Sequence, residues 1–382
     1  MIADIKVIPR MLVGHAERTV RALLESADVR VGGDRPDDIQ VHDRQFYTRL
    51  LRDGRLGLGE SYMDGHWDAE SVDQLTAKLL RARLQDQLPD WRTAIYVVAA
   101  RAWNLQSSAR AFQAGERHYD IGNDLYQPML GETLSYTCAY WKDAANLDEA
   151  QESKFDLVCR KLGLAPGMKV LELGCGYGTF ARHAARHYGV EVTGYTVSRE
   201  QATLGTELCK GLPVDLRLAD YRSARGSYDV VLSIGMMEHV GPKNHRGYME
   251  IVDRCLAPDG VAFIHTIGSN TDQTIIDAWF HKYLFPNAAI PSLAQITTAM
   301  GGLFVPEDVH NIGPHYDRTL MAWCENFDRA WPSLRPRYGD RFQRMWRYYL
   351  LSCAGAFRAR FLQLYQMVMT RPGTRQPDCR RV

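Results

Sequence analysis

The stretch Val170-Leu171-Glu172-Leu173-Gly174-Cys175-Gly176-Tyr177-Gly178 joins a short apolar strand to a glycine-rich turn. The residues that follow have the apolar spacing of a helix, so the segment predicts a strand, a tight turn and a helix in succession. The glycines are spaced GxGxG rather than GxGxxG. A dinucleotide site would also need an acid about 20 residues further on, to hold a ribose diol. The next predicted strand ends instead in Gly194-Tyr195-Thr196-Val197-Ser198, which contains no acid.

The position of the nearest acid indicates a different ligand. Glu172 directly precedes the glycine turn, and a carboxylate there favours a ligand that carries positive charge. S-adenosylmethionine fits this description, because it is an adenosine with a sulfonium and an ammonium group and no pyrophosphate. Gly174 and Gly176 would let the backbone approach its amino-acid end closely. Asp220 and Tyr221, just past a later strand, are placed to bind the adenine amine and to stack on the ring.

Outward from the turn, short apolar strands alternate with amphipathic helices from residue 148 onward. We predict strands at 169–173, 190–195, 214–218, 228–234 and 260–266, and helices at 149–162, 179–188, 198–210 and 244–256. This succession predicts a parallel sheet with helices on both faces, and ligands bound beyond the carboxyl ends of its strands. Beyond it we predict a helix near 273–283, a strand at 303–309, aromatic-rich helices at 316–330 and 339–369, and a frayed tail from residue 371.

The 382 residues exceed the size of a single hydrophobic core, so a second, smaller domain is expected. We predict a mainly helical N-terminal domain over residues 1–105, a polar linker at 106–117 and the larger domain over 118–382. Between residues 50 and 65 the glycines cluster, which predicts turns and close packing. We assign no chemistry to this segment.

Composition narrows the class of protein further. The chain is 46% hydrophobic and 24% charged with a net charge of +1, as in ordinary globular proteins. No apolar run approaches the roughly 18–20 residues of a membrane span, and the N-terminus lacks the apolar core of a signal peptide. Eight scattered cysteines without a CxxC pair predict free thiols in a reducing compartment. We therefore expect a cytoplasmic protein.

Arginine is concentrated at the C-terminal end of the chain. Residues 331–382 contain eleven arginines, no lysine, no glutamate and two aspartates, a local net charge of +9. One interpretation is a solvated helix face or a bridge to acidic residues elsewhere in the fold. The other is a patch attracted to phosphate-bearing partners, nucleic acid or anionic lipid. In the second case Arg341, Arg344 and Arg347 would face a membrane, with Trp346 and the Tyr348-Tyr349 pair at the headgroups.

Several stretches together resemble one family, the cyclopropane-fatty-acyl-phospholipid synthases and their mycolic-acid relatives. They are His118-Tyr119-Asp120-Ile121-Gly122-Asn123-Asp124, Tyr136-Thr137-Cys138-Ala139-Tyr140-Trp141, the glycine turn, Gly235-Met236-Met237-Glu238-His239-Val240-Gly241-Pro242, His265-Thr266-Ile267-Gly268-Ser269, and Tyr316-Asp317 with residues 319–323. The resemblance covers roughly residues 40–370. It implies the Rossmann-like sheet of a class I S-adenosylmethionine-dependent methyltransferase beside the helical N-terminal domain. One N-terminal stretch is similar to the branch of this family that acts on phospholipids: Leu58-Gly59-Glu60-Ser61-Tyr62-Met63-Asp64-Gly65.

The resemblance also implies roles for individual residues. The family's general base is a bound bicarbonate, and its matching ligands here are Cys138, Glu238, His265, Tyr316 and the backbone amide of Ile267. We expect Glu238 at the end of one strand and His265 near the end of the next, so that both approach the carboxyl edge of the sheet. The implied cofactor residues are Tyr136, Thr137, Glu172, Gly174, Gly176, Thr196, Gln201, Asp220 and Tyr221. Glu238 and His239 resemble part of a metal-binding motif, but adjacent residues on an extended segment point to opposite sides. No third residue stands at a spacing that would complete a metal site, so we predict no metal.

The chemistry is consistent with these residue types. A cis alkene is a poor nucleophile, so the methyl donor must already be activated, and closing a three-membered ring then requires a base. The pocket must be apolar to exclude water, and aromatic faces stabilise a carbocation. The implied partners are membrane phospholipids with cis-unsaturated acyl chains. The protein would reach them by peripheral association with the inner face of the membrane. A homodimer is also implied, and nucleic acid is not a partner. Two alternatives remain: a same-fold methyltransferase giving methyl-branched or methylene products, and a non-catalytic lipid-binding protein.

Overall fold

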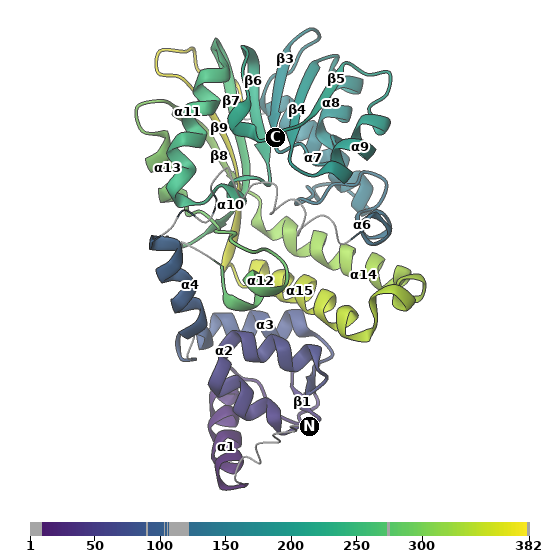
Figure 1. Cartoon of the computed structure of the whole chain (residues 1–382), viewed down its shortest axis with the longest axis vertical. Coiled ribbons are helices and arrows are strands. Elements are labelled where there is room, and N and C mark those ends of the chain that lie inside the picture. The colour runs from purple at the N-terminus through teal and green to yellow at the C-terminus, as the bar shows by residue number, and fades with distance from the viewer. Residues whose placement is uncertain are drawn as a thin grey trace, which may run out of the picture.

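The glycine turn lies at the carboxyl edge of a seven-stranded sheet in the upper part of the molecule, and a group of helices lies below it (Figure 1). The computed structural model describes residues 10–88, 91–102, 104, 106, 122–272 and 276–379. The motif residues 118–121 and the predicted linker beyond residue 106 lie outside the described residues.

The sheet has the strand order β5-β4-β3-β6-β7-β9-β8. Its first five strands along the chain are all parallel: β3 (Lys169–Leu173), β4 (Glu191–Thr196), β5 (Val214–Leu218), β6 (Tyr228–Ile234) and β7 (Leu256–Ser269). The predicted strands 169–173, 214–218 and 228–234 have the predicted bounds.

Helices cover both faces of the sheet, as the alternating pattern predicts. One face packs against α7 (Leu147–Lys161) and α8 (Thr179–Tyr188), through side chains such as Phe155 and Phe180. The other packs against α11 (His245–Cys255) and α13 (Leu293–Met300), through Tyr248 and Ile296. The remaining helices of this part are α6 (Asn123–Leu130), α9 (Arg199–Leu208), α10 (Met237–Val240) and α12 (Ala278–Tyr283).

The predicted helix over 339–369 is wrong in its second half. The helix α15 (Asp340–Arg358) ends before Arg360, whose φ of +59° is left-handed, and β9 (Leu362–Thr370) follows. This strand lies between β7 and β8 (Val305–Asn311) and runs antiparallel to both. It is buried over most of its length, so its sequence lacks the alternation that identifies a half-buried strand.

The predicted fraying of the tail is also wrong as far as residue 379. Arg371 donates to Asp253 Oδ1 at 2.7 Å and to the carbonyl of Ala257 at 2.7 Å. Cys379 is buried in the core on one face of the sheet. All eight cysteines are free thiols, as predicted.

The N-terminal part is mainly helical, as predicted. It contains α1 (Arg10–Ser26), α2 (Gln45–Met63), α3 (Val72–Arg81), the 3₁₀ turn η1 (Leu84–Asp86) and α4 (Trp91–Ala102). A small antiparallel pair, β1 (Gln40–Val41) and β2 (Trp67–Asp68), completes it. The glycine-rich segment forms most of α2 rather than turns, with one kink at Gly54, where φ is +55°. The prediction of close packing is confirmed, because a Cβ on Gly59 would lie 2.5 Å from the ring of Trp279 on α12.

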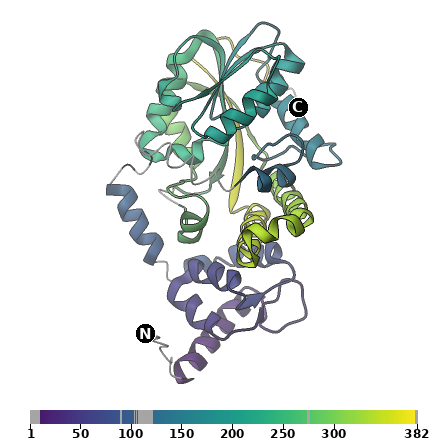
Figure 2. The ribbon, with the colours of Figure 1, turned by 45° about the vertical axis from the view of Figure 1, so that its right-hand side comes forward.

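Two long C-terminal helices, α14 (Gly313–Tyr338) and α15, lie between the sheet and the N-terminal helices (Figure 2). Arg358 on α15 connects the two parts. Its guanidinium donates to Asp317 on α14 at 2.8 Å and also pairs with Asp73 on α3. These contacts place the sheet, the C-terminal helices and the N-terminal helices in one continuous structure.

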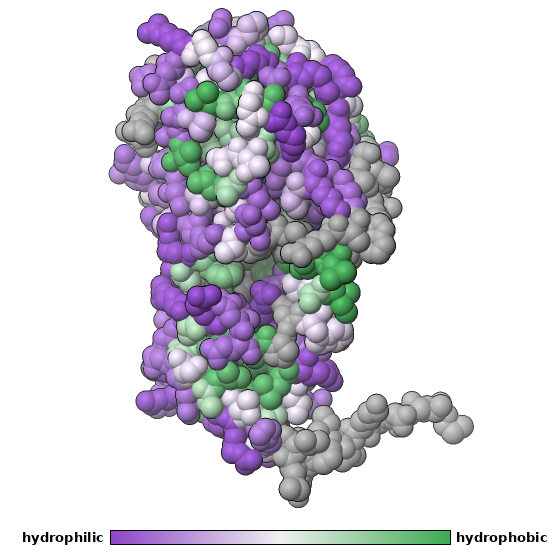
Figure 3. Space-filling view, turned by 90° about the vertical axis from the view of Figure 1, so that its left-hand side faces the viewer, coloured by the Kyte–Doolittle hydropathy of each residue, from purple (hydrophilic) through white to green (hydrophobic). Residues whose placement is uncertain are grey.

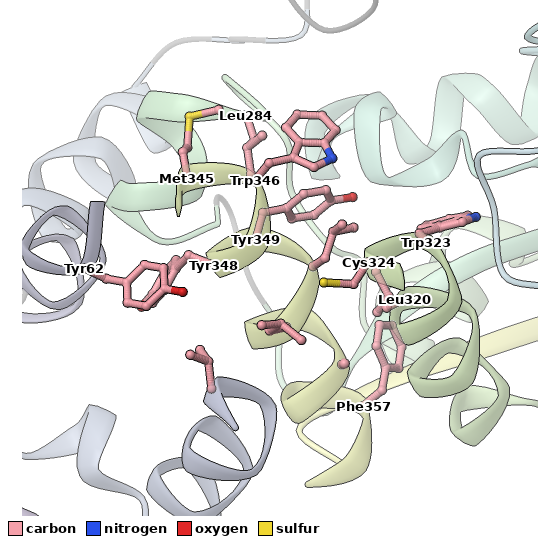
Figure 4. Close-up of a cluster of buried hydrophobic side chains, with 14 of the residues drawn as sticks. Tyr62, Leu284, Leu320, Trp323, Cys324, Met345, Trp346, Tyr348, Tyr349 and Phe357 are labelled. Carbon is pink, nitrogen blue, oxygen red and sulfur yellow. The ribbon is translucent and has the colours of Figure 1, made fainter. Parts of the chain in front are cut away.

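The arginines of α15 pair with acidic residues elsewhere in the fold, which confirms the first interpretation of their charge. Arg341 and Arg344 bond Asp64 and Asp68 of the N-terminal part at 2.9 and 2.7 Å, and Arg347 pairs with Asp328. The neighbouring aromatic residues Trp346, Tyr348 and Tyr349 are buried in the hydrophobic cluster of Figure 4. The predicted placement of these aromatic residues at the membrane headgroups is therefore wrong.

Candidate active site

The glycine turn has the shape that a closely approaching ligand needs. The amides of Gly174 and Cys175 both donate to the carbonyl of Tyr195 at 2.9 Å, which ties the turn to the end of β4. Gly176 has a φ of +55°, and a Cβ built there would meet nothing closer than the Gln201 side chain at 4.0 Å. The backbone at Gly176 therefore borders open space, as a turn that holds a cofactor should.

Glu172 supplies a buried negative charge beside this turn. It lies on β3 and is 3% exposed, and its Oε2 has no hydrogen-bond partner. Burial raises the pKa of Glu172 to about 8, against the opposing effect of the buried Lys154 ammonium and a backbone hydrogen bond from Ala181. A cationic ligand would pair with this carboxylate and favour its ionised form. The residues at the turn therefore fit S-adenosylmethionine.

The other predicted cofactor residues lie at the ends of the next two strands. Thr196 Oγ1, at the end of β4, donates to Gln201 Oε1 on α9 at 3.1 Å, and both side chains are buried. Asp220 follows β5 and accepts from the amide and the guanidinium of Arg222, each at 2.8 Å. The ring of Tyr221 is mostly buried, with the Arg222 guanidinium 4.7 Å from its centre.

Glu238 lies on the one-turn helix α10 after β6, not at the end of the strand as predicted. The reason is that β6 ends at Ile234, and the chain turns through Gly235 before the helix begins. The backbone amide of Ile267 donates to Glu238 Oε1 at 2.7 Å, while the buried Oε2 has no partner. Burial raises the pKa of Glu238 to about 7, despite hydrogen bonds from the backbone. In this structure the Ile267 amide therefore contacts Glu238, and its role toward a bicarbonate oxygen stays a prediction.

Glu238 and Tyr316 line the same cavity, and His265 and Cys138 are buried side chains. His265 lies on β7, and its Nδ1 is 3.4 Å from the amide nitrogen of Gln366 on β9. The buried Nε2 has no partner, and burial lowers the pKa of His265 well below its usual value, so the ring is neutral. When the Gln366 amide donates to Nδ1, the Nε2 atom carries the proton and is a donor.

Cys138 and Tyr316 complete this cluster as neutral groups. Cys138 is fully buried, and burial raises the pKa of its thiol, which donates to the carbonyl of Ala139 at 3.2 Å. Burial also raises the pKa of Tyr316, and the charges of Cys138 and Glu238 raise it further. The buried Oε2 of Glu238 and Nε2 of His265 each lack a hydrogen-bond partner, so each has the capacity to bond a small polar ligand such as bicarbonate.

An apolar cavity of about 290 Å³ adjoins the cluster. Tyr136, Thr137, Glu238, Ile267 and Tyr316 form part of its wall. Further wall residues are leucines of the N-terminal helices: Leu23, Leu24, Leu50, Leu58, Leu79, Leu80 and Leu84. Aromatic residues of the C-terminal helices complete it, and Figure 4 shows Tyr348, Tyr349 and Phe357 projecting from α15 in this region. The two parts of the chain thus share one apolar cavity.

Sequence reasoning missed Lys154, which is fully buried on α7 between the two groups of site residues. Its Nζ donates to the hydroxyls of Ser135 and Thr137 at 2.7 and 2.8 Å. A signal was present in the sequence, because Lys154 follows Leu147 and Ala150 at helical spacing on the apolar face of the predicted helix.

Comparison with known proteins defines first the class and then the family. The fold is that of class I S-adenosylmethionine-dependent methyltransferases. Mycolic acid cyclopropane synthase CmaA1, solved in complex with SAH and CTAB, is 27% identical with a TM-score of 0.63 over 68% of this chain and 97% of that one. A sequence profile for the family described as mycolic acid cyclopropane synthetase matches residues 106–367.

Full-length relatives agree with this assignment. The chain is 48% identical to the cyclopropane-fatty-acyl-phospholipid synthase of Escherichia coli (strain K12), over 93% of each chain. It is 33% identical to a probable fatty acid methyltransferase of Pseudomonas putida, over 87% of each chain. The chain belongs to the cyclopropane synthase family.

The glycine turn yields the first prediction. Gly176→Val places a branched side chain in the open space beside the turn, so we expect binding of S-adenosylmethionine to be lost in calorimetric titration. Gly163→Val is the matched control, because its φ of +60° imposes similar strain and no atom lies within 4 Å of its Cβ. Both variants should lose similar thermal stability, but only the first should lose binding. Wild-type affinity in Gly176→Val would refute the assignment of the turn.

A second prediction concerns the pH dependence of turnover. We predict that Glu238 acts in its ionised form, as the acceptor that orients the base, and its raised pKa of about 7 means that this form is lost as the pH falls through 7. We expect turnover to fall on the acidic side of about pH 7. Glu238→Gln should lower turnover by about 10²–10⁴-fold and remove this acidic limb, with unchanged affinity for S-adenosylmethionine. Undiminished activity of Glu238→Gln in bicarbonate-depleted buffer would contradict the role of this group.

Proposed function

We propose that this chain transfers a methylene group from S-adenosylmethionine to the cis double bond of an unsaturated phospholipid acyl chain, forming a cyclopropane ring. The observation that carries the proposal is the apolar cavity that contacts both the Glu238 cluster and the leucines of the N-terminal helices. A long acyl chain matches such a lining, because apolar side chains offer no partner to a polar substrate. The N-terminal part is then a lipid-binding domain, with the boundaries predicted above.

The residues of the chain have distinct tasks in this reaction. When bound beside the glycine turn, S-adenosylmethionine supplies an activated methyl group and retains the electrons of the broken carbon–sulfur bond. Glu172 holds the positive charge of the cofactor, and Tyr136 and Thr137 cover it. Asp220 and Tyr221 contact the adenine side, and Thr196 and Gln201 the ribose side. The apolar cavity excludes water that would otherwise add to the alkyl cation.

Ring closure breaks a C–H bond of the new methyl group, and the freed electron pair forms the last ring bond. The proton must pass to a base, which we propose is a bicarbonate held by Cys138, Glu238, His265 and Tyr316. The Glu238 carboxylate accepts the hydroxyl proton of this ligand and makes its other oxygens more basic. His265 Nε2 and the Tyr316 hydroxyl donate hydrogen bonds to it.

A second candidate function is favoured by the 33% identical relative named as a probable fatty acid methyltransferase. In that case the reaction would stop after methyl transfer and give a methyl-branched or methylene-bearing acyl chain. The two functions share the cofactor and the substrate and differ in the fate of the alkyl cation. Loss of a methyl proton with ring closure gives the cyclopropane, a hydride shift followed by loss of a methyl proton gives a methylene branch, and loss of a chain proton gives a methyl-branched alkene. The products, rather than the binding sites, separate them.

Lipid analysis after expression in cells that lack cyclopropane lipids tests the function. We expect unsaturated phospholipid acyl chains to gain one CH₂, together with the upfield proton resonances of a cyclopropane ring. The resonance is needed because a methylene branch adds the same mass as a ring. A mass gain without the ring signal would favour the second candidate, and unaltered lipids would support the non-catalytic alternative.

We also propose that the protein reaches its substrate as a peripheral protein at the inner face of the membrane. Within the described part of the chain, no helix is both long and apolar enough to cross a bilayer. The helix α4 bears Trp91, Ile95 and Val98 at helical spacing, exposed by 49%, 57% and 66%. Hydrophobic residues stand at the surface on this side of the molecule at mid-height (Figure 3). Such a face is suited to insertion among lipid headgroups.

The position of α4 supports lipid as the occupant of this face. Thr93 accepts from the amide of Ala278 on α12 at 3.0 Å, and Tyr96 stacks on His281 at 4.1 Å. Trp279 and Phe280 of α12 in turn line the apolar cavity. A bilayer in contact with α4 would therefore lie next to the wall of the proposed acyl site. The homodimer implied by the resemblance stays a proposal, which light scattering tests.

The α4 face gives the third prediction. Ile95→Asn with Val98→Asn should weaken co-sedimentation with phosphatidylethanolamine–phosphatidylglycerol vesicles by about tenfold or more, because each side chain contributes about 1 kcal/mol on leaving water. Val305→Asn with Val309→Asn, on β8 and exposed by 41% and 42%, is the matched control and should bind normally. Both variants should retain activity on detergent-dispersed lipid.

Three results would contradict the assignment of the α4 face as the membrane contact. Unchanged vesicle binding of the α4 variant would place the contact elsewhere, and equal weakening of the β8 control would remove its specificity. A change in the molar mass of the α4 variant would identify the face as an interface between protein copies.

A further inference from the structure

Arg55 is a cationic side chain in the mostly apolar wall of the cavity, and the proposed mechanism does not use it. Among the described residues that line the cavity, it is the only arginine or lysine. It belongs to the glycine-rich segment of α2 and directly follows the kink at Gly54. Its side chain is 33% exposed, so it lies at the boundary between the cavity wall and solvent. A cation there can bond a charged group of a ligand whose apolar part fills the cavity.

The Arg55 guanidinium faces one carboxylate, that of Asp277, with Nη1 at 3.8 Å from Oδ2. This separation is longer than the roughly 2.7–2.9 Å of a charge-assisted hydrogen bond. The other oxygen of Asp277 accepts from the amides of Trp279 and Phe280 at the start of α12, at 2.9 and 3.2 Å. A guanidinium has five N–H donors, so it can bond an anionic oxygen of a ligand and stay close to Asp277 at the same time.

Arg55 lies close to α4, the helix of the proposed bilayer contact. Three residues before Arg55, the carbonyl of Arg52 accepts from the indole of Trp91 on α4 at 3.2 Å. The residue that follows Asp277 donates its amide to Thr93 on α4 at 3.0 Å. The ion pair of Arg55 and Asp277 therefore lies where α2, α4 and α12 meet (Figure 1).

The substrate of the proposed function has an anion that suits this position. A phospholipid carries a phosphodiester at the glycerol end of its acyl chains, and its reacting double bond must reach Glu238 and Tyr316 in the cavity wall. An acyl chain that enters from the α4 side passes the part of the wall that the N-terminal helices form, and this part contains Arg55. The phosphate would then stay at the solvent boundary while the acyl chain leaves water.

We propose that Arg55 binds the phosphodiester of the phospholipid substrate and so selects phosphate-bearing lipids over neutral ones. The contact is a charge-assisted hydrogen bond to a phosphate oxygen, and it requires no particular group beyond the phosphate. The inference rests on the proposed function, because it takes a phospholipid as the occupant of the cavity. Arg55 contributes to substrate binding and takes no part in methyl transfer or ring closure.

The test measures the binding of two saturated lipids, dioctanoylphosphatidylglycerol and dioctanoylglycerol, in the same neutral detergent. Neither lipid has a double bond, so binding is measured without turnover, and the detergent removes the contribution of a bilayer. The quantity compared is the ratio of the two dissociation constants. Arg55→Gln removes the cation. Arg52→Gln is the matched control, because Arg52 lies on the same helix, is 69% exposed and is not among the described residues that line the cavity.

We expect the wild-type protein to bind the phosphatidylglycerol more tightly than the diacylglycerol. Arg55→Gln should lower this preference by about tenfold to a hundredfold, the range for a lost hydrogen bond to a charged group. Arg52→Gln should keep the wild-type preference.

A double variant, Arg55→Gln with Asp277→Asn, removes the carboxylate that would otherwise repel the phosphate in the single variant. Asparagine also caps helices, so α12 keeps its cap. The double variant should lose the preference as far as Arg55→Gln does, because both lack the cationic donor. If Arg55→Gln does not fold, the double variant carries the test, since it leaves no carboxylate without its cation.

Several results would overturn the inference. Equal binding of the two lipids by the wild-type protein, or an unchanged preference in Arg55→Gln, would place the phosphate elsewhere. An equal loss in Arg52→Gln would reduce the effect to general charge. A wild-type preference in the double variant would show that Asp277 repels the phosphate and that Arg55 does not bind it.

Two further measurements separate this inference from its neighbours. Inorganic phosphate should not displace the phosphatidylglycerol from the wild-type protein at equal concentration; displacement would identify a site for a free anion and refute lipid selection. Ring formation from unsaturated phospholipid is measured separately. A preference that depends on Arg55 without ring formation would support this inference and count against the proposed function alone.

Discussion

Ionisable groups at the carboxyl edge of the sheet are buried away from water, and this burial determines both their pKa values and their unused hydrogen-bonding capacity. Glu172, Glu238 and His265 are all buried, and each keeps one polar atom without a hydrogen-bond partner. Each such atom costs about 1–3 kcal/mol of folding stability. The same burial moves the pKa of both carboxyl groups into the range where proton exchange and pairing with a cation occur near neutral pH. The hydrophobic clusters on both faces of the sheet and around α14 and α15 offset this cost.

The C-terminal helices make this burial possible, because they close the site on the side away from the sheet. Tyr316 on α14 packs against Trp323 and Phe357, and the hydroxyls of Tyr136 and Tyr349 lie 2.8 Å apart. Arg341, Arg344 and Arg358 of α15 bind acidic residues of the N-terminal part, and Arg347 binds Asp328 on α14. The basic charge of this region is therefore used in ion pairs within the fold. It orients the helices whose aromatic faces form the cavity wall.

The sequence predicted the parallel strands well because their apolar runs are short and are bounded by helices with clear caps. Asn146 and Ser198 cap α7 and α9 through their side chains, and the helices begin within two residues of the predicted positions. β9 was missed because a fully buried strand has no alternation. The cofactor turn and the residues proposed to act with Glu238 were predicted from motifs, and their roles stay predictions. The burial of Lys154 had a signal in the spacing of its helix, but the bond from Ile267 to Glu238 depends on tertiary packing, which spacing along one strand does not reveal.

The shared cavity explains why a small helical part accompanies the sheet. An acyl chain that meets Glu238 and Tyr316 needs apolar walls well beyond the reacting carbons, and the sheet edge alone presents polar loop ends. The leucines of α1, α2 and α3 supply such walls. Arg358 pairs with both Asp317 on α14 and Asp73 on α3, and so holds the N-terminal helices in position next to the C-terminal helices. Under the proposed function, exclusion of water at the reacting carbons depends on ion pairs between the two parts of the chain, because both parts line the cavity that would hold the acyl chain.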